Sequence, residues 1–291
     1  MYQFDLSICV PTYNRADLIG RLLDSIPSND RVEVVIHDDG STDGTAAIVK
    51  EYVRLNNALV YEWKPNAGRA SALREAILRA RGRYVLLMDS DDYFVESGVD
   101  SVLEVIDRID SFTAQGMNLR SAVFGVKLEK NGKATVNLPP DGVITNLLAL
   151  RADLDVRKDL KELVEGRLLK ECMYEIPPGV RRVPTSLLWT EVAEKTDCMC
   201  VAKAVAVKEY LPGGMTDRIK SLKVQNAAPL YDLYDLISRS KRYCSVQHRF
   251  KAALLRQVYA LHTGKPLAGS ALQMALLPIA LPLYFYQKRY R

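Results

Sequence analysis

Three aspartates follow a strongly apolar run near residue 90, and their spacing suits the binding of a divalent cation. The apolar run, residues 84–88, is followed directly by Asp89, Ser90, Asp91 and Asp92. Like charges this close repel each other unless something of opposite charge compensates them. Carboxylate oxygens are the ligands that Mg²⁺ and Mn²⁺ prefer, and these ions share their coordination with substrate phosphates. The cluster therefore predicts a metal-bound diphosphate, although one of the aspartates can instead cap the following helix.

Polar, turn-forming residues follow two other apolar runs in the same way. The first run, residues 6–10, is followed by Pro11, Thr12, Tyr13 and Asn14. The second run, residues 32–37, is followed by Asp38, Asp39, Gly40, Ser41, Thr42 and Asp43. One such cluster is an ordinary turn or helix cap, and Ser41 or Asp43 suits that role. Three clusters, two of them with adjacent carboxylates, indicate a ligand site.

The elements that must position these clusters alternate between strands and helices. Apolar runs typical of strands cover residues 6–10, 32–37, 59–63 and 84–88, and helical periodicity covers residues 17–26, 45–55 and 70–80. Short apolar strands that alternate with helices predict an α/β fold with a parallel sheet covered on both faces. In such sheets ligands bind at the carboxyl ends of the strands, which is where all three polar clusters fall.

The pattern changes beyond residue 112. We expect strands at residues 121–129 and 198–207, a helix at residues 185–196, and helices from about residue 217 to the end. The segment 130–133 (KNGK) is typical of a hairpin turn that leads into a strand at residues 134–138. The sequence therefore predicts three parts, which are residues 1–112, 113–216 and 217–291.

The charge of the chain is distributed unevenly. The net charge is +5, but residues 1–150 carry 16 Lys and Arg against 21 Asp and Glu, whereas residues 151–291 carry 24 against 14. An acidic half suits cations, and a basic half suits an anionic surface or acceptor, unless its basic residues are ordinary solvated surface. The hydrophobic content of 48% and the charged content of 26% are typical of a globular protein and exclude a disordered chain.

The cysteines and the N-terminus bear on the cellular compartment. The five cysteines, Cys9, Cys172, Cys198, Cys200 and Cys244, lack the spacing of a zinc site. Their odd number indicates free thiols in a reducing cytosol. The N-terminus has no basic region followed by an apolar stretch, so we expect no signal peptide and a cytoplasmic location.

Four segments together resemble the inverting glycosyltransferases of family 2. They are, in order, SICVPTYNRADLIGRLLDSI, VEVVIHDDGSTDGT, NAGRASALREAI and GRYVLLMDSDDYF. The resemblance covers roughly residues 4–112 and implies the GT-A fold, a mixed sheet flanked by helices, here with a helical C-terminal extension. It also implies a nucleotide-diphospho-sugar donor, most often a UDP-sugar, bound together with Mn²⁺ or Mg²⁺.

The resemblance implies roles for individual residues. The nucleobase and ribose would be held by Pro11, Tyr13, Asp38 and Asp39, with Thr12 and Asn14 in the same binding loop. Asp89, Ser90 and Asp91 match the Asp-x-Asp element of the family. Asp91 would be the chief metal ligand, Asp89 would face the ribose or sugar beside the metal, and Asp92 would be a second ligand.

The third segment contributes a loop that approaches the sugar nucleotide. Gly68 and Arg69 belong to this loop, and the Arg69 guanidinium would neutralise phosphate or else lie at the surface. Arg74 stands where the family often has asparagine, so its contact with the donor would differ or it would face solvent.

An inverting transferase also needs a carboxylate that takes the proton of the acceptor hydroxyl. Family members usually carry this acid far beyond the Asp-x-Asp element, just before a helix, where this chain has Pro184, Thr185 and Ser186. Glu191 is the nearest carboxylate and is the predicted base, unless it is an ordinary solvated helix charge. Further candidates are Glu194, Glu171 and Glu175.

The C-terminal segment predicts contact with a membrane. Residues 267–286 contain no charged side chain, and the basic residues Lys288, Arg289 and Arg291 follow them. The length just suffices to span a bilayer, but Pro278 and Pro282 would interrupt a spanning helix. We expect a membrane-interface segment with its aromatic side chains at headgroup depth, preceded by the basic amphipathic segment 238–262. The alternative is a C-terminal helix that packs on the rest of the protein.

The predicted function is a metal-dependent inverting glycosyltransferase that moves a sugar to a hydroxyl of a glycan or lipid-linked acceptor. By analogy with family members, it would serve surface polysaccharide synthesis at the inner face of the cytoplasmic membrane, without a nucleic acid partner. One alternative is a sugar nucleotidyltransferase, which normally needs a glycine-rich loop after the first strand that this chain lacks. The other is a homologue that binds sugar nucleotide or membrane without turnover, which the missing acid at residues 185–186 favours.

Overall fold

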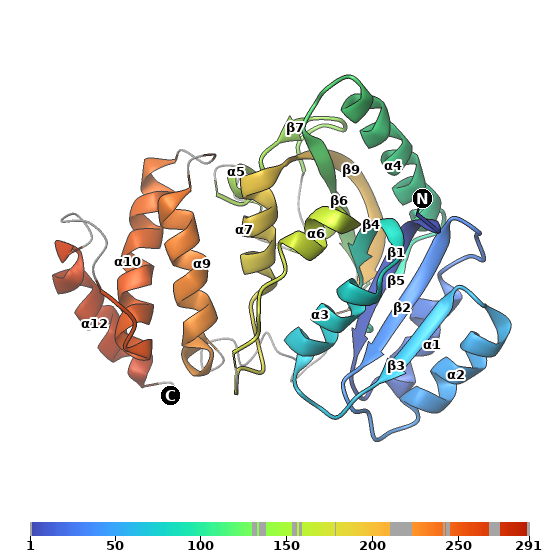
Figure 1. Cartoon of the computed structure of the whole chain (residues 1–291), viewed down its shortest axis with the longest axis horizontal. Helices are drawn as coiled ribbons and strands as arrows, with labels where there is room; N and C mark the ends of the chain where they lie inside the picture. The colour runs from blue at the N-terminus through green and yellow to red at the C-terminus, as the bar shows by residue number, and fades with distance from the viewer. Residues whose placement is uncertain are drawn as a thin grey trace. The chain divides into compact units, whose positions relative to one another are not determined.

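The structure is a computed structural model that describes residues 2–129, 133, 138–152, 156, 159–177, 179–209, 223–240, 242, 245–267 and 274–289. The chain forms two compact units, and each unit collects separate segments of the sequence. The first unit contains Met1–Thr145, Val156–Glu175 and Thr196–Tyr210. The second contains Asn146–Asp155, Ile176–Lys195 and Leu211–Arg291. Figure 1 labels most of the helices and strands of both units.

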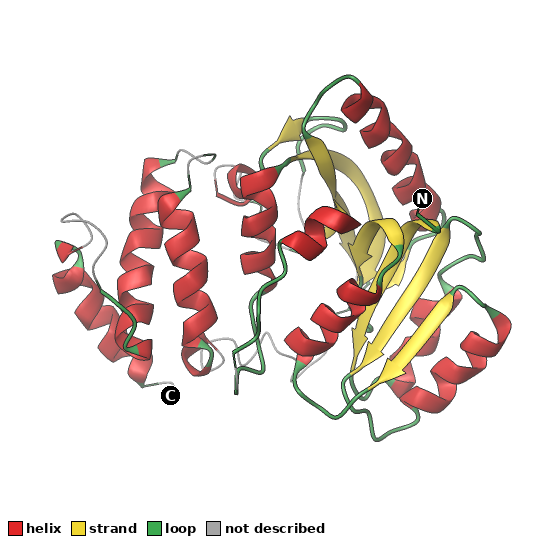
Figure 2. Ribbon diagram, viewed as in Figure 1, coloured by secondary structure: helices red, strands yellow, loops and turns green. Residues whose placement is uncertain are grey.

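A mixed sheet, nine-stranded within the described residues, is the centre of the first unit (Figure 2). Its strands are β1 (Phe4–Thr12), β2 (Val32–Asp38), β3 (Leu59–Trp63), β4 (Gly82–Leu87), β5 (Tyr93–Phe94), β6 (Leu119–Leu128), β7 (Ile144–Thr145), β8 (Lys161–Glu165) and β9 (Asp197–Lys208). Their order is β3-β2-β1-β4-β8-β6-β9-β5, and β7 pairs with β9. The strands β1 to β4 are parallel neighbours, whereas β8 runs antiparallel to β4 and β6.

Helices cover both faces of this sheet. The helices of the first unit are α1 (Ala16–Asp24), α2 (Thr45–Leu55), α3 (Arg69–Arg79), α4 (Gly98–Ala114) and α6 (Gly166–Glu171). Because side chains alternate along a strand, β1 serves two cores at once. Ile8 belongs to the core that contains residues of α1, α2 and α4, while the Cys9 thiol donates a hydrogen bond to the Ala76 carbonyl of α3 at 3.4 Å. Burial on both faces explains why the parallel strands read as nearly continuous apolar runs.

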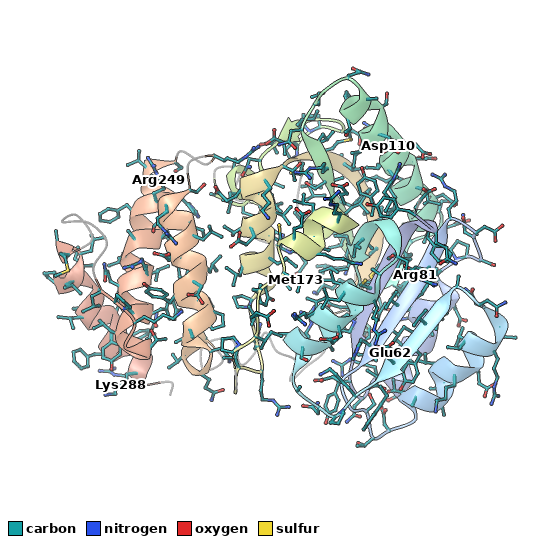
Figure 3. The ribbon with its side chains drawn as sticks, viewed as in Figure 1. Glu62, Arg81, Asp110, Met173, Arg249 and Lys288 are labelled. Atoms are coloured by element: carbon teal, nitrogen blue, oxygen red, sulfur yellow. The ribbon has the colours of Figure 1, made fainter. Side chains whose placement is uncertain are left out.

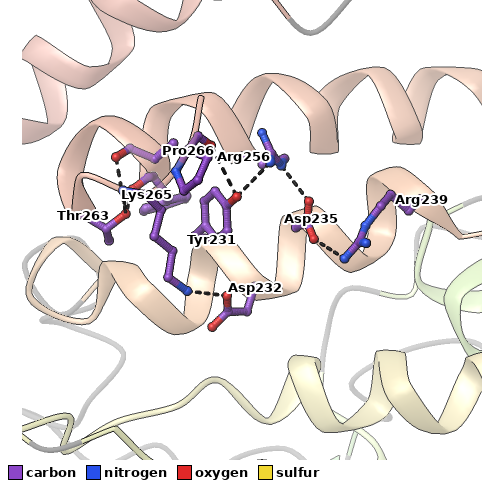
Figure 4. A network of polar contacts seen from close by, with 10 residues as sticks. Tyr231, Asp232, Asp235, Arg239, Arg256, Thr263, Lys265 and Pro266 are labelled. Carbon is purple, nitrogen blue, oxygen red and sulfur yellow. Dashed lines mark hydrogen bonds and ion pairs between the residues drawn. The ribbon is translucent and has the colours of Figure 1, made fainter. Parts of the chain in front are cut away.

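The second unit is helical within the described residues. It contains α5 (Leu147–Ala152), α7 (Thr185–Lys195), α9 (Ala227–Arg239), α10 (Val246–Thr263) and α12 (Leu277–Lys288). The buried Arg256 of α10 donates hydrogen bonds to Asp235 and Tyr231 of α9, both at 2.7 Å, and to the Leu267 carbonyl at 3.1 Å (Figure 4). These contacts fasten α10 both to α9 and to the segment that follows it.

Within the described part of the chain, no helix has both the length and the apolar composition required to cross a membrane.

Most of the expected elements are confirmed. The predicted α/β class, the mixed sheet flanked by helices and the helical C-terminal region are all present. The expected elements at residues 121–129, 185–196 and 198–207 correspond to β6, α7 and β9. The sequence patterns did not predict β5, β7 or β8. The predicted turn at residues 130–133 and the strand at residues 134–138 fall largely outside the described residues, as does Cys244.

Candidate functional site

The carboxyl ends of the parallel strands bring the polar clusters together. Across the sheet, Thr12 of β1 lies beside Asp38 of β2, and Asp38 lies beside Trp63 of β3. On the other side of β1, the Met88 amide donates to the Cys9 carbonyl at 3.0 Å, so that Asp89 follows at the same edge. The predicted convergence of the three clusters is therefore present.

The loops after β1 and β2 form one connected structure. Asn14 has a positive φ of 49°. Its backbone N–H donates to the Ser41 hydroxyl at 2.8 Å, and its side-chain oxygen accepts from the Thr42 backbone amide at 2.9 Å. Asp43 accepts from the Thr45 amide at 3.0 Å just before α2, although the N-cap residue of this helix is Gly44. Pro11 and Thr12 are buried below this loop pair, whereas Tyr13 is exposed.

The two aspartates at the end of β2 hold neighbouring segments in place. Asp38 accepts from the Ser41 amide at 2.8 Å and from the Tyr61 hydroxyl at 2.6 Å. Burial, together with the bond to Asp38, raises the pKa of Tyr61. Asp39 accepts from Lys64 at 2.8 Å and from the Ala67 and Gly68 amides at 2.9 and 2.8 Å.

Asp39 thereby fixes the loop that leads into α3. Gly68 in this loop has a φ of 99°, a conformation that side chains rarely adopt. The fixed loop places Arg69 at the first position of the helix, where its guanidinium forms an ion pair with Asp89. The predicted contacts of Asp38 and Asp39 with nucleobase and ribose stay predictions.

The pair of Arg69 and Asp89 links α3 to the end of β4. Burial alone would raise the pKa of Asp89, but the attraction of Arg69, with that of Lys161 and Lys208, holds the pKa of this carboxyl well below its usual range. Asp89 is therefore ionised at neutral pH. Burial raises the pKa of the nearby Tyr174 to about 12, which the Arg69 charge opposes.

Asp91 is the least committed of the three aspartates. Its side chain is 27% exposed, and within the described residues its carboxylate forms one ion pair, 3.8 Å from the Arg15 guanidinium. Its backbone carbonyl accepts from Arg21 at 3.1 Å, and the same arginine is ion-paired with Glu129 and Glu209 at 2.8 Å. The backbone at Asp91 is thus held while its carboxylate stays accessible.

Asp92 lies in a different environment from Asp91. It is buried and forms an ion pair with Lys161 of β8 at 2.6 Å. Among the described residues, no three Asp, Glu, His or Cys side chains are placed to hold one metal ion together. The arrangement does not support Asp92 as a second metal ligand, because its charge is already balanced inside the protein. Ser90, between the other two, is buried.

The residues around Asp91 fit a hard divalent cation that is bound together with a substrate. Mg²⁺ usually takes one or two protein carboxylates and completes its coordination with water and phosphate oxygens. Asp91 provides an accessible carboxylate of this kind. Arg15 and Arg69 provide positive charge at the same edge, which suits the remaining charge of a diphosphate.

Several cations of the site were not singled out from the sequence. Arg15 directly follows the first polar cluster, and Lys64 directly follows the third strand. Both positions follow from the rule that ligands bind at the carboxyl edge of the strands. Lys161 and Lys208 lie on β8 and β9, and their charges lower the pKa of Asp89. Both are far from Asp89 in the sequence, so no local sequence pattern indicates this interaction.

The candidate bases lie in different surroundings. Glu191 belongs to α7 in the second unit, and burial raises its pKa while Lys195 opposes the rise. Glu194 accepts a hydrogen bond from Ser240. In the first unit, Glu171 is ion-paired with Arg167 at 3.2 Å and the exposed Glu175 with Arg74 at 3.1 Å. Which of these four carboxylates acts as the base stays a prediction.

Comparison with known proteins identifies relatives of the first part of the chain. Residues 7–126 match the sequence model of the family described as Glycosyl transferase family 2. The Bacillus subtilis protein TuaG, named as a teichuronic acid biosynthesis glycosyltransferase, is 33% identical over 147 residues, which are 49% of this chain and 58% of TuaG. The Pasteurella multocida hyaluronan synthase is 39% identical over 101 residues, which are 34% of this chain and 10% of that protein. The chain thus covers less than two thirds of these relatives.

Solved structures share the fold of the chain. The Staphylococcus aureus TarS 1–349 complex with UDP-GlcNAc aligns with a TM-score of 0.68 at 18% identity and covers 98% of this chain and 81% of that one. The mannosyltransferase PcManGT of Pyrobaculum calidifontis, in complex with GDP-Man and Mn²⁺, aligns with a TM-score of 0.51 at 20% identity and covers 100% and 83%. With the mixed sheet already described, these likenesses show that the chain has the GT-A fold, and its residues 7–126 are the segment that is similar to glycosyltransferase family 2.

Proposed function

We propose that the protein is a metal-dependent inverting glycosyltransferase that uses a nucleotide-diphospho-sugar, in particular a UDP-sugar, as donor. The observation that carries the proposal is the carboxyl edge of the sheet, where the accessible Asp91 lies beside Arg15 and near the Asp89–Arg69 pair. The acceptor is a hydroxyl of a glycan or lipid-linked saccharide. This part is supported by the names of relatives, because TuaG is named for teichuronic acid biosynthesis and TarS is named as a poly(ribitol-phosphate) beta-N-acetylglucosaminyltransferase.

The chemistry assigns a task to each group. Arg15 and Arg69 attract the diphosphate, and Asp91 holds Mn²⁺ or Mg²⁺, which when bound withdraws charge from the leaving group as a Lewis acid. A carboxylate base, for which Glu191 is the candidate that the sequence offers, takes the proton of the acceptor hydroxyl as that oxygen forms a bond to the anomeric carbon. The bond from that carbon to the diphosphate oxygen breaks on the opposite face, which inverts the configuration. The nucleoside diphosphate leaves with the electron pair of the broken bond.

The second candidate function is donor binding without turnover. It is favoured by one feature, which is that Pro184, Thr185 and Ser186 stand at the start of α7 in place of an acid. Release of UDP from UDP-sugars in the presence of membranes or lipid extract separates the two. An enzyme releases UDP in proportion to protein, whereas a pure binder releases none.

A thermal-shift panel tests the proposed donor. A ligand that binds only the folded state raises the free energy of unfolding with the logarithm of its excess over Kd, by about 2.7 kcal/mol at a hundredfold excess. We expect UDP and UDP-sugars to raise the melting temperature in Mn²⁺ and to have much less effect in a chelator. If no nucleoside diphosphate in the panel raised the melting temperature, the proposed donor would be wrong.

Tryptophan fluorescence tests where the donor binds. The chain has two tryptophans, and Trp63, 53% exposed, lies at the end of β3 with its indole N–H donating to the Ser41 carbonyl at 3.3 Å. Trp189 is buried in α7 of the second unit. In a Trp189→Phe variant, Trp63 is the only tryptophan that fluoresces. We expect UDP to change its emission, because Ser41, which accepts the hydrogen bond from Trp63, also contacts Asn14 in the proposed donor site. If UDP changed the fluorescence of the Trp63→Phe variant as much as that of the unaltered protein, the nucleotide would bind away from Trp63.

A conservative change at Glu191 tests the base. Glu191→Gln removes the proton acceptor without changing the size of the side chain, so we expect UDP release to fall by about 100-fold or more while UDP affinity stays unchanged. Glu51→Gln, which changes an exposed carboxylate of α2 in the first unit, is the matched control. Full activity of Glu191→Gln together with loss of activity in Glu175→Gln would transfer the role to Glu175.

We also propose that the protein works at the inner face of the cytoplasmic membrane, where a lipid-linked acceptor would be found. The excess of basic residues in the second half of the sequence supports this location. The C-terminal region provides the membrane contact.

A further inference from the structure

We infer that the exposed face of α12 is a docking surface for an anionic lipid bilayer and that the helix lies flat in the membrane interface. The inference rests on the membrane contact included in the proposed function and specifies which residues make it. The helix α12 belongs to the second unit, whereas the proposed donor site belongs to the first.

One stripe of α12 attaches the helix to α10. Leu276, directly before the helix, and Ala280 are buried, and Tyr284 and Gln287 on the same stripe are half-buried. Residues three or four apart lie on one face of a helix, so these four form a continuous inner face. The Tyr284 ring lies 4.6 Å from the His262 ring of α10. The helix is therefore seated on the protein through a narrow face.

The rest of the helix is both apolar and exposed. Five large apolar or aromatic side chains on it are between 37% and 60% exposed, namely Ile279, Leu281, Leu283, Phe285 and Tyr286. The two prolines of the helix are exposed as well, and no charged residue occurs before Lys288. Single exposed apolar residues are normal, but a contiguous group of this kind marks a surface that something apolar covers.

The charges at the end of the helix indicate that a lipid surface covers it. The apolar face ends in two exposed cations, Lys288 and Arg289. Figure 3 labels Lys288, and its ammonium group lies 5.8 Å from the Tyr284 ring centre. Long basic side chains and tyrosines that border an apolar surface match a bilayer interface, where cations reach anionic headgroups and the rings lie at headgroup depth.

The length of α12 decides its orientation. Its 12 residues measure about 18 Å along the axis, well short of the roughly 30 Å of a hydrocarbon core. One stripe also remains bound to α10, which a membrane-spanning helix would have to give up. The helix therefore inserts its outer face only to the boundary between headgroups and acyl chains.

Sedimentation of the full-length protein with vesicles tests the inference. We expect binding to vesicles of equimolar phosphatidylcholine and phosphatidylglycerol. The double variant Ile279→Glu with Phe285→Glu places two charges in the apolar face, and its affinity should fall about 100-fold or more. Lys288→Gln with Arg289→Gln should lower the affinity for these vesicles by roughly 30-fold, because each basic residue near an anionic surface contributes about fivefold.

A matched control lies in the first unit. Leu55 of α2 is an exposed leucine, 86% accessible, so Leu55→Glu makes the same kind of change far from α12 in the sequence, and it should leave vesicle binding unaltered. Vesicle binding of the Ile279→Glu, Phe285→Glu variant at the level of the unaltered protein would overturn the inference. So would light scattering that shows a dimer which this variant splits, because a second copy would then cover the face.

The thermal shift with UDP and Mn²⁺ separates this inference from the donor site. The α12 variants should keep the shift of the unaltered protein. If the unaltered protein did not bind vesicles but still showed the thermal shift with UDP and Mn²⁺, only the docking surface on α12 would be disproved. An absent shift with intact vesicle binding would remove only the proposed donor.

Discussion

Replacement of Asp91 by asparagine is expected to abolish sugar transfer while the protein stays folded. Asparagine keeps the size of the side chain but removes the negative charge that holds the cation. We expect the affinity for UDP in Mn²⁺ to fall about 100-fold and the rate of UDP release to fall about 1000-fold, which corresponds to about 4 kcal/mol of lost transition-state stabilisation. The melting temperature without ligand should change little, because the one described ion pair of Asp91 is partly exposed and spans 3.8 Å.

Asp30 provides the matched control for this experiment. It is an exposed aspartate just before β2, at the amino edge of the sheet, opposite the proposed site. Asp30→Asn should leave UDP affinity and UDP release at the level of the unaltered protein. If Asp91→Asn bound UDP in a Mn²⁺-dependent manner as well as the unaltered protein, the metal would have to be held elsewhere.

The second large effect concerns stability and the pair of Asp92 and Lys161. Both side chains are buried, and removal of one partner leaves the other as an uncompensated buried charge. We expect Lys161→Met or Asp92→Asn to lower the free energy of unfolding by about 3–5 kcal/mol. The melting temperature should fall by roughly 6–20 °C. The double variant Lys161→Met with Asp92→Leu should recover most of this loss, because both charges are then gone.

The ion pair between Glu51 and Arg54 of α2 serves as the control. Its distance of 2.7 Å is similar to that of the buried pair, but both side chains are strongly exposed. Glu51→Gln should therefore cost no more than about 0.5 kcal/mol. If Asp92 were a metal ligand instead, Asp92→Asn would keep the melting temperature of the free protein and lose the response to Mn²⁺. That outcome would contradict the structural role assigned here.

The parallel half of the sheet could be predicted from the sequence because its signals are local. The strands β1 to β4 are apolar along their length, and turn-forming residues mark their ends. The rule that ligands bind at the carboxyl edge then points to Tyr13, Asp39 and Asp91 from the sequence alone. The same rule, applied to the end of the third strand, also points to Lys64.

The antiparallel part was harder to predict because its signals are not local. The strand β8 has the sequence KELVE, and both Lys161 and Glu162 are buried in it. Charged residues in a short segment indicate a surface loop, because a charge is buried only when an oppositely charged partner compensates it. The partner of Lys161 is Asp92, 69 positions earlier in the chain, so only the folded structure shows that this segment belongs to the core.

The same reason explains why adjacent aspartates have different roles. Asp89, Asp91 and Asp92 have nearly the same position in the sequence, but Arg69 and Lys161 neutralise the first and the last. The middle one, Asp91, has only a long ion pair of 3.8 Å with Arg15 among the described residues. Spacing alone predicted a group of three metal ligands, and it could not show that cations from distant elements give the three carboxylates different surroundings.

The most direct test of the account is the position of manganese in a crystal grown with MnCl₂ and UDP. Anomalous scattering locates the ion without assumptions about the protein. The account predicts a single manganese peak at the Asp91 carboxylate, shared with oxygens of the UDP diphosphate, at the carboxyl edge of β1 and β4. A map with UDP bound and no manganese at Asp91, or with manganese held by other residues, would contradict it.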